Sequence, residues 1–309
     1  MDNTIDIQHI QHDHAGEHAL RDVSWQVRPG TLCGLIGADG AGKSTLFRIL
    51  ATLLKPQSGS ARLLGLDVVT QRRELRPLIG YMPQRFSLYA DLSVEENLRF
   101  AAEIMQVPST TIPATLERLL KFVRLDFARK RRAGRLSGGM KQKLALCCAL
   151  VRAPRLLLLD EPTVGVDPVT RRDFWDLLGH LREQGTTLLV STPYMDEAGL
   201  CDQVILLHQG QVVGRGSPSE LCAKLPGRLW KVSAPEILHS PVSASPPARL
   251  FSLYPSGGTL HVLAPETLSA QEVLIAAQTQ CPQATQCQPG EPQVEDVLLW
   301  ALRNQGNPT

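Results

Sequence analysis

The stretch Gly37-Ala38-Asp39-Gly40-Ala41-Gly42-Lys43-Ser44 decides the fold. Two glycines separated by four residues and followed by Lys43 and Ser44 match the pattern of a phosphate-binding loop. The apolar run 32–36 predicts a buried strand before the loop, and residues 45–54 predict a helix after it. Glycines let the backbone fold around phosphates, and the N–H groups at the helix N-terminus face the anion. A glycine-rich turn with a chance lysine does not account for this strand and helix.

The side chains of this loop indicate what each one binds. Lys43 supplies a point charge for β- and γ-phosphates, and Ser44 supplies a hydroxyl for Mg²⁺. We also assign Thr45, at the start of the predicted helix, to the nucleotide-binding set. Asp39 places a carboxylate beside a site built for anions, which is compatible with binding if the side chain turns to solvent or caps a local N–H group.

Length and composition are those of an ordinary globular protein. The chain has 309 residues, 43% hydrophobic and 20% charged, with a formal net charge of +2. We expect no membrane-spanning segment, because no apolar run approaches the roughly 20 residues that a bilayer requires. The first residues lack a basic and apolar leader, and the seven cysteines lack a disulfide framework. These features predict a reducing, cytosolic setting.

Strand and helix patterns alternate along most of the chain, which predicts a largely parallel sheet with helices on both faces. Residues 93–153 are helical in pattern, with a capping box from Ser93 to Glu96, and Pro108 and Pro113 separate two helices. A further amphipathic helix is predicted over 171–182. The predicted strands cover residues 5–7, 20–27, 32–36, 60–64, 79–82, 156–159, 186–190, 203–208 and 211–213.

Two polar segments each have a structural and a functional interpretation. Four of the eight histidines fall within residues 9–18, where a metal site is conceivable. No acidic or cysteine ligand set completes it, so we favour a polar strand edge or a contact to a nucleotide base. The basic residues within 130–135 favour a solvated helix end over a nucleic-acid site, because no aromatic residues are interleaved.

After Cys222 the composition changes, and prolines interrupt the chain at positions 226, 235, 241, 246 and 247. Residues 249–253 and 259–263 flank Ser256-Gly257-Gly258 and predict a hairpin, and residues 268–279 and 294–302 predict helices. We therefore expect a nucleotide-binding domain over residues 1–222 and a small α+β appendage over residues 223–309.

Two further motifs carry chemistry. Four leucines precede Asp160 and Glu161 and predict a strand that lifts Asp160 to the edge of the sheet, where it can hold Mg²⁺. Glu161 can then act as general base toward the attacking water. In LSGGMKQ, which starts at Leu136, Ser137 caps a helix whose N-terminus makes a second anion site. A head-to-tail dimer brings this second site onto a partner's nucleotide.

Together these motifs resemble the ATP-binding subunits of ABC transporters, over about residues 5–221. Other segments resemble the branch that includes daunorubicin-resistance-type drug exporters, whose cassettes often carry a C-terminal appendage. They are Tyr81-Met82-Pro83-Gln84, Gly165-Val166-Asp167-Pro168 and Met195-Asp196-Glu197-Ala198. The pieces that match the wider family are the phosphate loop, Gln84, LSGGMKQ, LLLLDEP from Leu156 and Val166-Asp167-Pro168.

The resemblance implies an α/β ATP-binding cassette with a helical subdomain over about residues 86–152, and ATP with Mg²⁺ as ligands. It implies that Gln84 contacts Mg²⁺ and water, joining Ser44 and Asp160 as metal residues, and that Asp167 communicates across the dimer. The adenine-stacking aromatic of the family falls near His14, whose imidazole stacks more weakly than tyrosine. The residues that meet the partner's nucleotide are Ser137, Gly138, Gly139 and Gln142.

One position departs from the family. The histidine that senses the γ-phosphate is replaced by Pro193, which has no hydrogen-bond donor. Loss of one preorganised contact of this kind costs about a hundredfold or more in rate, so we expect slow hydrolysis at this chain's own site. We favour a heterodimer with a second cassette that keeps its histidine, and a homodimer that tolerates Pro193 is the alternative.

We therefore expect an ATPase subunit that powers an exporter of drug-like or other small molecules, on the cytoplasmic face of the inner or plasma membrane. Its transmembrane permease is expected to be a separate chain. A soluble ABC ATPase acting on nucleic acid or the ribosome is an alternative. It lacks support, because the chain has no sustained heptads and a single cassette. A catalytically silent regulatory cassette is a variant of the favoured function that Pro193 keeps open.

Overall fold

A six-stranded sheet forms the centre of the first part of the chain in the computed structural model, which describes residues 3–14, 16–85, 88–234, 249–256 and 258–304. The pairings β3–β8, β3–β9, β7–β8 and β6–β7 are all parallel, which confirms the predicted architecture. In spatial order the strands are β10 (Gln211–Gly216), β9 (Gln203–His208), β3 (Leu32–Ile36), β8 (Thr187–Thr192), β7 (Leu156–Asp160) and β6 (Ile79–Met82).

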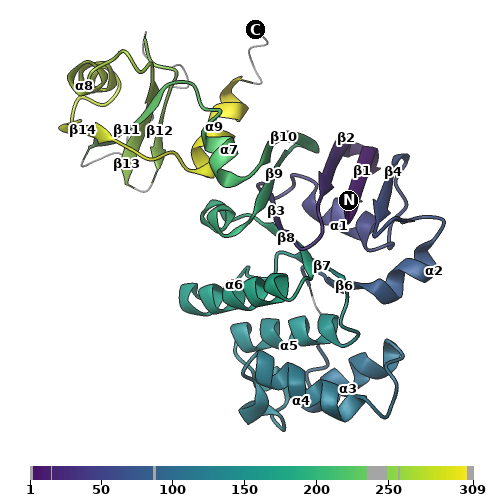
Figure 1. The fold of residues 1–309 in the computed structure, drawn as a ribbon. Helices are drawn as coiled ribbons and strands as arrows, with labels where there is room; N and C mark the ends of the chain where they lie inside the picture. Colours follow the sequence, from purple (N-terminus) through teal and green to yellow (C-terminus); the bar gives the residue numbers. More distant parts are fainter. Residues whose placement is uncertain (1–2, 15, 86–87, 235–248, 257, 305–309) are drawn as a thin grey trace. The chain divides into compact units, whose positions relative to one another are not determined.

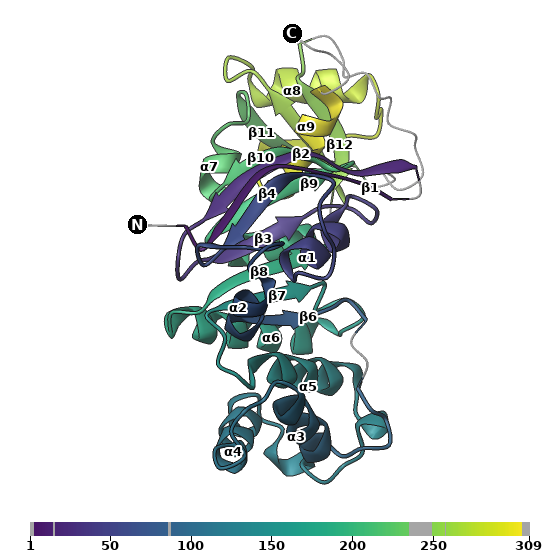
Figure 2. The same ribbon diagram turned by 90° about the vertical axis from the view of Figure 1, so that its right-hand side faces the viewer.

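A second sheet of four antiparallel strands packs over the first in the same unit (Figure 2). Its order is β2 (Glu17–Val27), β1 (Ile5–His14), β4 (Ser58–Leu63) and β5 (Leu66–Asp67). The prediction ended β1 at residue 7, but the strand runs on to His14, so the histidine-rich segment forms the far end of the β1–β2 hairpin.

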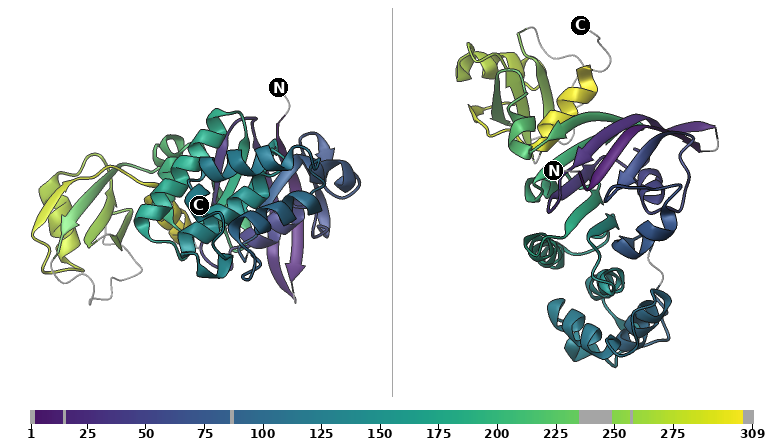
Figure 3. Two further views of the ribbon diagram at one scale, coloured as in Figure 1. Left: turned by 90° about the horizontal axis from the view of Figure 1, so that it is seen from below. Right: turned by 45° about the vertical axis from the view of Figure 1, so that its right-hand side comes forward.

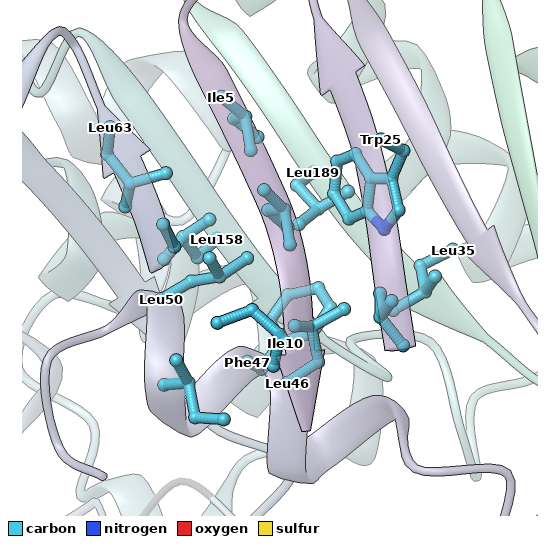
Figure 4. Packing of buried hydrophobic residues seen from close by; sticks show 14 of the residues in the cluster. Ile5, Ile10, Trp25, Leu35, Leu46, Phe47, Leu50, Leu63, Leu158 and Leu189 are labelled. Atoms are coloured by element: carbon cyan, nitrogen blue, oxygen red, sulfur yellow. The ribbon is translucent and has the colours of Figure 1, made fainter. Parts of the chain in front are cut away.

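Helix α1 (Lys43–Leu50) lies between the two sheets, and their shared core fills the space around it (Figure 4). Phe47, Ile10 and Trp25 are almost completely buried in this core. The alternating leucines of β7 divide between the two faces of its sheet, and Leu156 and Leu158 belong to the core on the α1 side. Both faces of these strands are therefore buried, as is usual for parallel sheets.

The remaining helices of this unit are α2 (Arg72–Leu75), α3 (Val94–Ile104), α4 (Ile112–Phe122), α5 (Gly138–Leu150) and α6 (Pro168–Glu183). Helices α3, α4 and α5 gather at the end of the unit away from β1 and β2 (Figures 1 and 3). Short 3₁₀ turns cover Arg76–Leu78, Asp126–Ala128, Ala133–Arg135 and Met195–Leu200. Residues 86–87, where the helical subdomain was expected to begin, lie outside the described residues.

Two helices differ locally from the sequence prediction, each for a clear physical reason. Helix α1 begins at Lys43 because Gly42, with φ 103°, forms its N-cap, and it ends before Thr52, which has φ 63°. Pro113 lies in the first turn of α4 rather than between helices, where its missing N–H group is not needed. The capping box at Ser93 and Glu96 is present as predicted.

The chain divides into two compact units, Met1–Arg215 and Gly216–Thr309. The second unit contains an antiparallel sheet in the order β12-β13-β11-β14. Strands β11 and β14 and helix α7 were not predicted, and the prolines at 235–247 and Gly257 lie outside the described residues. Its elements are α7 (Pro218–Cys222), β11 (Arg228–Ser233), β12 (Ser252–Ser256), β13 (Thr259–Ala264), α8 (Ala270–Gln278), β14 (Gln286–Pro289) and α9 (Val294–Asn304).

A buried polar cluster links the sheet of the second unit to α9. The Asp296 carboxylate accepts hydrogen bonds from the Tyr254 hydroxyl and the His261 ring, each at 2.6 Å, and from the Gln293 N–H group at 2.6 Å. On the other face of this sheet, α8 packs Val273 and Ala277 against Val262 and its neighbours. Among the described residues of the whole chain, none of the helices is long and apolar enough to span a bilayer.

Candidate nucleotide-binding site

Three neighbouring parallel strands bring the predicted site residues to one edge of the sheet. The glycine-rich loop follows β3, Asp160 ends β7, and β8 lies between them. The carboxyl ends of parallel strands share one edge, where ligands of such sheets bind. Residues that are about 120 positions apart in sequence therefore meet at this edge.

Two glycines of the loop are required by their surroundings. A Cβ atom added to Gly37 would lie 2.2 Å from the Leu207 carbonyl oxygen. A Cβ added to Gly42 would lie 2.3 Å from the Ala19 carbonyl oxygen, and this glycine also has a positive φ of 103°. Both positions exclude any side chain, so the tight path of the loop depends on glycine.

Lys43 is buried within the loop that precedes it. Its ammonium group donates hydrogen bonds to the carbonyl oxygens of Gly37 at 2.7 Å and Ala38 at 3.1 Å. It also forms an ion pair with Glu161 Oε1 at 3.0 Å, and both side chains are at most 5% exposed. The ammonium group is thus fixed at the mouth of the helix N-terminus, where a phosphate chain is expected to bind.

Glu161 is held by both its carboxylate and its backbone. Oε2 accepts a hydrogen bond from Gln84 Nε2 at 2.7 Å, and the backbone N–H group donates to Ser191 Oγ at 2.8 Å. The residue has φ 52°, a left-handed conformation that is uncommon outside glycine and that clusters at functional sites. The surrounding contacts therefore aim a carboxylate into the pocket from an unusual backbone position.

Asp160 lies behind Glu161 and is 2% exposed. Burial raises the pKa of Asp160, and hydrogen bonds from the Ser191 and Ser44 hydroxyls partly offset that rise. A hydroxyl, a carboxylate and an amide from Ser44, Asp160 and Gln84 provide oxygen ligands, which Mg²⁺ prefers. The donor set and the glycine cradle therefore fit a magnesium-bound triphosphate.

One pocket of about 320 Å³ collects most of the predicted nucleotide-binding residues. His14 lines it, as does His18, which the sequence analysis did not assign. His18 Nδ1 lies 2.6 Å from Asp13 Oδ1. Within the described residues no group of three or more histidine, cysteine or acidic side chains is arranged to hold a metal ion. The pocket is lined by His14, His18, Ala19, Asp39, Gly40, Ala41, Gly42, Lys43, Ser44, Thr45, Gln84 and Glu161.

The signature residues lie in a different place. Ser137 caps α5 by accepting a hydrogen bond from the Met140 N–H group at 3.3 Å. Gly139 packs so closely on α6 that an added Cβ would lie 2.1 Å from Thr170 Cγ2. Gly138 and Gln142 line a second pocket of about 530 Å³, and the described lining of the nucleotide pocket contains none of the signature residues.

Asp167 caps the neighbouring helix α6, where its carboxylate accepts a hydrogen bond from the Thr170 N–H group at 3.0 Å. The loop that connects Glu161 to Asp167 carries Thr163, whose hydroxyl donates to Glu197 at 2.9 Å. Glu197 is 2% exposed. The loop after the acidic strand end and the segment after β8 are therefore joined by a buried hydrogen bond.

Pro193 directly follows β8 and is half-buried. The next residue does not replace the missing donor, because the Tyr194 ring stacks under the Arg171 guanidinium, 4.6 Å from its centroid. Arg171 also bonds Asp196 Oδ2 at 2.8 Å. The aromatic ring is thus held against α6.

Sequence reasoning assigned the loop and the acidic pair but missed Ser191, Glu197 and His18. A small polar residue at the buried end of a strand, one strand away from the loop, is the signal that would have indicated Ser191. His18 reaches the pocket because β1 and β2 pair as far as His14 and Glu17, which is longer than their sequence patterns predict. Nothing local in the sequence indicates that Glu197 is buried.

The fold and the site define a P-loop nucleoside-triphosphate-binding protein. Residues 20–164 match the protein family described as ABC transporter. The Nod factor export ATP-binding protein I of Rhizobium etli is 36% identical over 224 residues, which are 72% of this chain and 71% of that protein. The chain belongs to the ABC transporter ATPase family.

Two other relatives are named for multidrug transport and for doxorubicin resistance. The probable multidrug ABC transporter ATP-binding protein YbhF of Escherichia coli is 45% identical over 217 residues, and the chain spans only 38% of its length. The doxorubicin resistance ATP-binding protein DrrA of Mycobacterium tuberculosis is 38% identical, over 66% of this chain and 62% of the relative.

Solved structures agree with this assignment. The ATP-binding subunit of an ABC transporter superposes with a TM-score of 0.64 at 28% identity, covering 72% of this chain and 92% of that one. Another is cbiO1 from Clostridium perfringens, described as part of the ABC transporter complex cbiONQ. Its TM-score is 0.66 at 29% identity, with the same coverage.

Proposed function

We propose that this chain is the ATP-binding and hydrolysing subunit of a membrane exporter of drug-like or other small molecules. The observation that carries the proposal is the buried ion pair of Lys43 with Glu161, whose carboxylate also accepts a hydrogen bond from Gln84. The names of the relatives, multidrug, doxorubicin resistance and Nod factor export, support an export role. The ATP-binding domain is proposed to cover residues 1–222.

In the proposed mechanism, loop amides and Lys43 bind the phosphates, and His14 contacts the adenine. Mg²⁺ bound by Ser44, Asp160 and Gln84 would neutralise charge on the phosphate oxygens. As the oxygen of the attacking water bonds to the γ-phosphorus and ADP leaves, Glu161 accepts the proton of that water, and Gln84 orients the Glu161 carboxylate. Before that, the phosphates compete with Glu161 for the Lys43 ammonium, because one buried cation serves both.

The signature residues act on a second cassette in this proposal. Ser137, Gly138, Gly139 and Gln142 lie outside the nucleotide pocket of their own chain, as a head-to-tail dimer requires. Asp167 caps α6 next to them and is proposed to relay between the two sites. Residues 86–152 are proposed to contact a separate transmembrane permease, which places the chain on the cytoplasmic face of the inner or plasma membrane.

Pro193 favours an asymmetric pair, in which a partner cassette with the usual histidine performs most hydrolysis. Tyr194 is held under Arg171, so its side chain does not substitute for that histidine. A catalytically silent cassette with a structural role is the second candidate, and the same observation favours it. The two differ in whether this chain's own site turns over ATP at all.

The test is ATP hydrolysis by the purified chain and by Pro193→His. We expect slow turnover that rises about a hundredfold in Pro193→His, because one preorganised donor is restored. Tyr194→His is the matched control: it introduces the same imidazole one residue later, on the side that faces Arg171, and gives no gain. Fast turnover that Pro193→His leaves unchanged contradicts the asymmetric pair, and no turnover in either form favours the silent cassette.

A further inference from the structure

Ser191 lies in the strand that separates the two halves of the nucleotide site. Strand β8 runs between β3 and β7, and its register pairs Ser191 with Leu35 on one side and Asp160 on the other. The residue is 0% exposed. Its side chain is therefore fixed inside the sheet edge from which the loop and the acidic pair emerge.

The Ser191 hydroxyl contacts both acidic residues. Its oxygen donates a hydrogen bond to Asp160 Oδ1 at 2.7 Å and accepts one from the Glu161 N–H group at 2.8 Å. A hydroxyl has one donor and two acceptor positions, so a single serine satisfies both contacts at once. Alanine or valine at this position would remove the donor to Asp160 and would leave the Glu161 N–H group with the longer contact to the Ser191 carbonyl oxygen, at 3.2 Å.

The two contacts control different atoms of the site. The hydrogen bond to Asp160 fixes the rotation of a carboxylate that is proposed to hold the metal. The hydrogen bond from Glu161 secures a residue with φ 52°, a conformation that persists only where the surroundings impose it. The carboxylate of Glu161 is held separately, by Lys43 and Gln84.

We propose that Ser191 is a positioning residue for the ATPase chemistry, because its hydroxyl orients the Asp160 carboxylate and anchors the backbone from which Glu161 projects. This inference rests on the function proposed above. Ser191 shares the orientation of the acidic pair with Ser44, which bonds Asp160, and with Lys43 and Gln84, which hold the Glu161 carboxylate. Pro193, two residues later, contributes no donor to the site. A serine two residues before Pro193 thus helps to orient the acidic residues of the site.

The experiment compares Ser191→Ala with Thr192→Val. Thr192 is the adjacent residue of β8, is also 0% exposed, and its hydroxyl accepts from the Tyr194 N–H group at 3.0 Å. Both variants remove one buried hydroxyl from the same strand end, and only Ser191 contacts the acidic pair. The readouts are ATP affinity without metal, the Mg²⁺ concentration that half-saturates metal-dependent ATP binding, and the single-turnover hydrolysis rate.

For Ser191→Ala we expect metal-free ATP affinity within about twofold of the wild type, because the loop is untouched. The half-saturating Mg²⁺ concentration should rise about tenfold, and the single-turnover rate should fall about tenfold or more, since small misplacements of reacting groups are costly. Thr192→Val should leave all three unchanged. Ser191→Cys fills the same space with a weaker donor and should show the same losses if the alanine variant does not fold.

Wild-type Mg²⁺ dependence and rate in Ser191→Ala would overturn the inference, as would equal losses in Thr192→Val. If the wild type binds ATP without hydrolysing it, the half-saturating Mg²⁺ concentration alone tests the role of Ser191. Failure of the wild type to bind ATP would instead overturn the proposed function, and the inference with it.

Discussion

The buried ion pair of Lys43 and Glu161 makes a two-sided prediction for Glu161→Gln. The two charged groups are 3.0 Å apart and 3% and 5% exposed. Removing one partner of a buried pair leaves an uncompensated charge, at a cost of about 3–5 kcal/mol. We expect the unfolding free energy of the first unit to fall by about 3 kcal/mol, which lowers Tm by about 6–12 °C for a unit of this size.

The same substitution should strengthen ATP binding. In the wild type the phosphates compete with the Glu161 carboxylate for the Lys43 ammonium, whereas in Glu161→Gln that competitor is neutral. We expect metal-free ATP affinity to rise about tenfold, equivalent to about 1.4 kcal/mol. ATP should therefore raise Tm more in the variant than in the wild type. Thermal unfolding with and without ATP, and titration with a fluorescent ATP analogue, measure both effects.

Glu197→Gln is the matched control. Glu197 is also buried and lies 3.7 Å from Arg171, but it bonds Thr163 rather than the loop. Its variant should leave ATP affinity unchanged. The reasoning is refuted if Glu161→Gln retains wild-type Tm and ATP affinity, or if Glu197→Gln tightens ATP binding equally.

Three further predictions concern other parts of the chain. Asp39→Asn removes an exposed carboxylate beside the phosphates and should raise ATP affinity about two- to threefold at low salt, measured by titration. Gly139→Ala should destabilise the first unit by about 1–3 kcal/mol in denaturant unfolding, through its clash with Thr170 Cγ2, and Thr170→Ser should relieve much of that loss. Burial opposes ionisation of Asp296, but hydrogen bonds from His261 and Tyr254 outweigh it and lower the pKa of Asp296. Its stabilising contribution is complete above about pH 4 and is lost as pH falls through the lowered folded pKa, so Asp296→Asn should flatten the acid limb of a Tm-against-pH curve.

Each of these has a contrary outcome. Equal ATP affinity of Asp39→Asn and wild type at low salt would show that the carboxylate lies outside the field of the phosphates. Unchanged stability of Gly139→Ala would show that α5 and α6 separate easily at this point. An unaltered acid limb in Asp296→Asn would show that the buried cluster does not contribute through ionisation of Asp296.

The phosphate loop was predictable because its signal is local. Two glycines, a lysine and a serine within eight residues fix both the turn and its chemistry. Asp160 and Glu161 were predictable because a run of leucines must be a buried strand, and its end must lie at the sheet edge. The contact of Ser191 with Asp160 joins residues 31 positions apart and depends on parallel register, which no local pattern specifies.

In the second unit, too, local sequence patterns predicted some elements, but contacts between distant segments could not be predicted. The 259–263 strand and the two helices were predicted from their apolar spacing. Strand β14 (Gln286–Pro289) was missed because three of its four residues are polar or proline, and it is a strand only through pairing with β11. The buried polar cluster of Tyr254, His261 and Asp296 likewise forms only through tertiary packing.

The measurement that tests the central claim most directly is equilibrium binding of ATP and Mg²⁺ to the purified chain, compared with Lys43→Ala. We predict saturable binding that weakens by about tenfold to a hundredfold in Lys43→Ala, because a hydrogen-bonded charge is lost. Lys121→Ala, which removes an exposed lysine paired with Glu117, should bind as the wild type does. Absence of binding, or equal affinity in Lys43→Ala and wild type, would contradict the account.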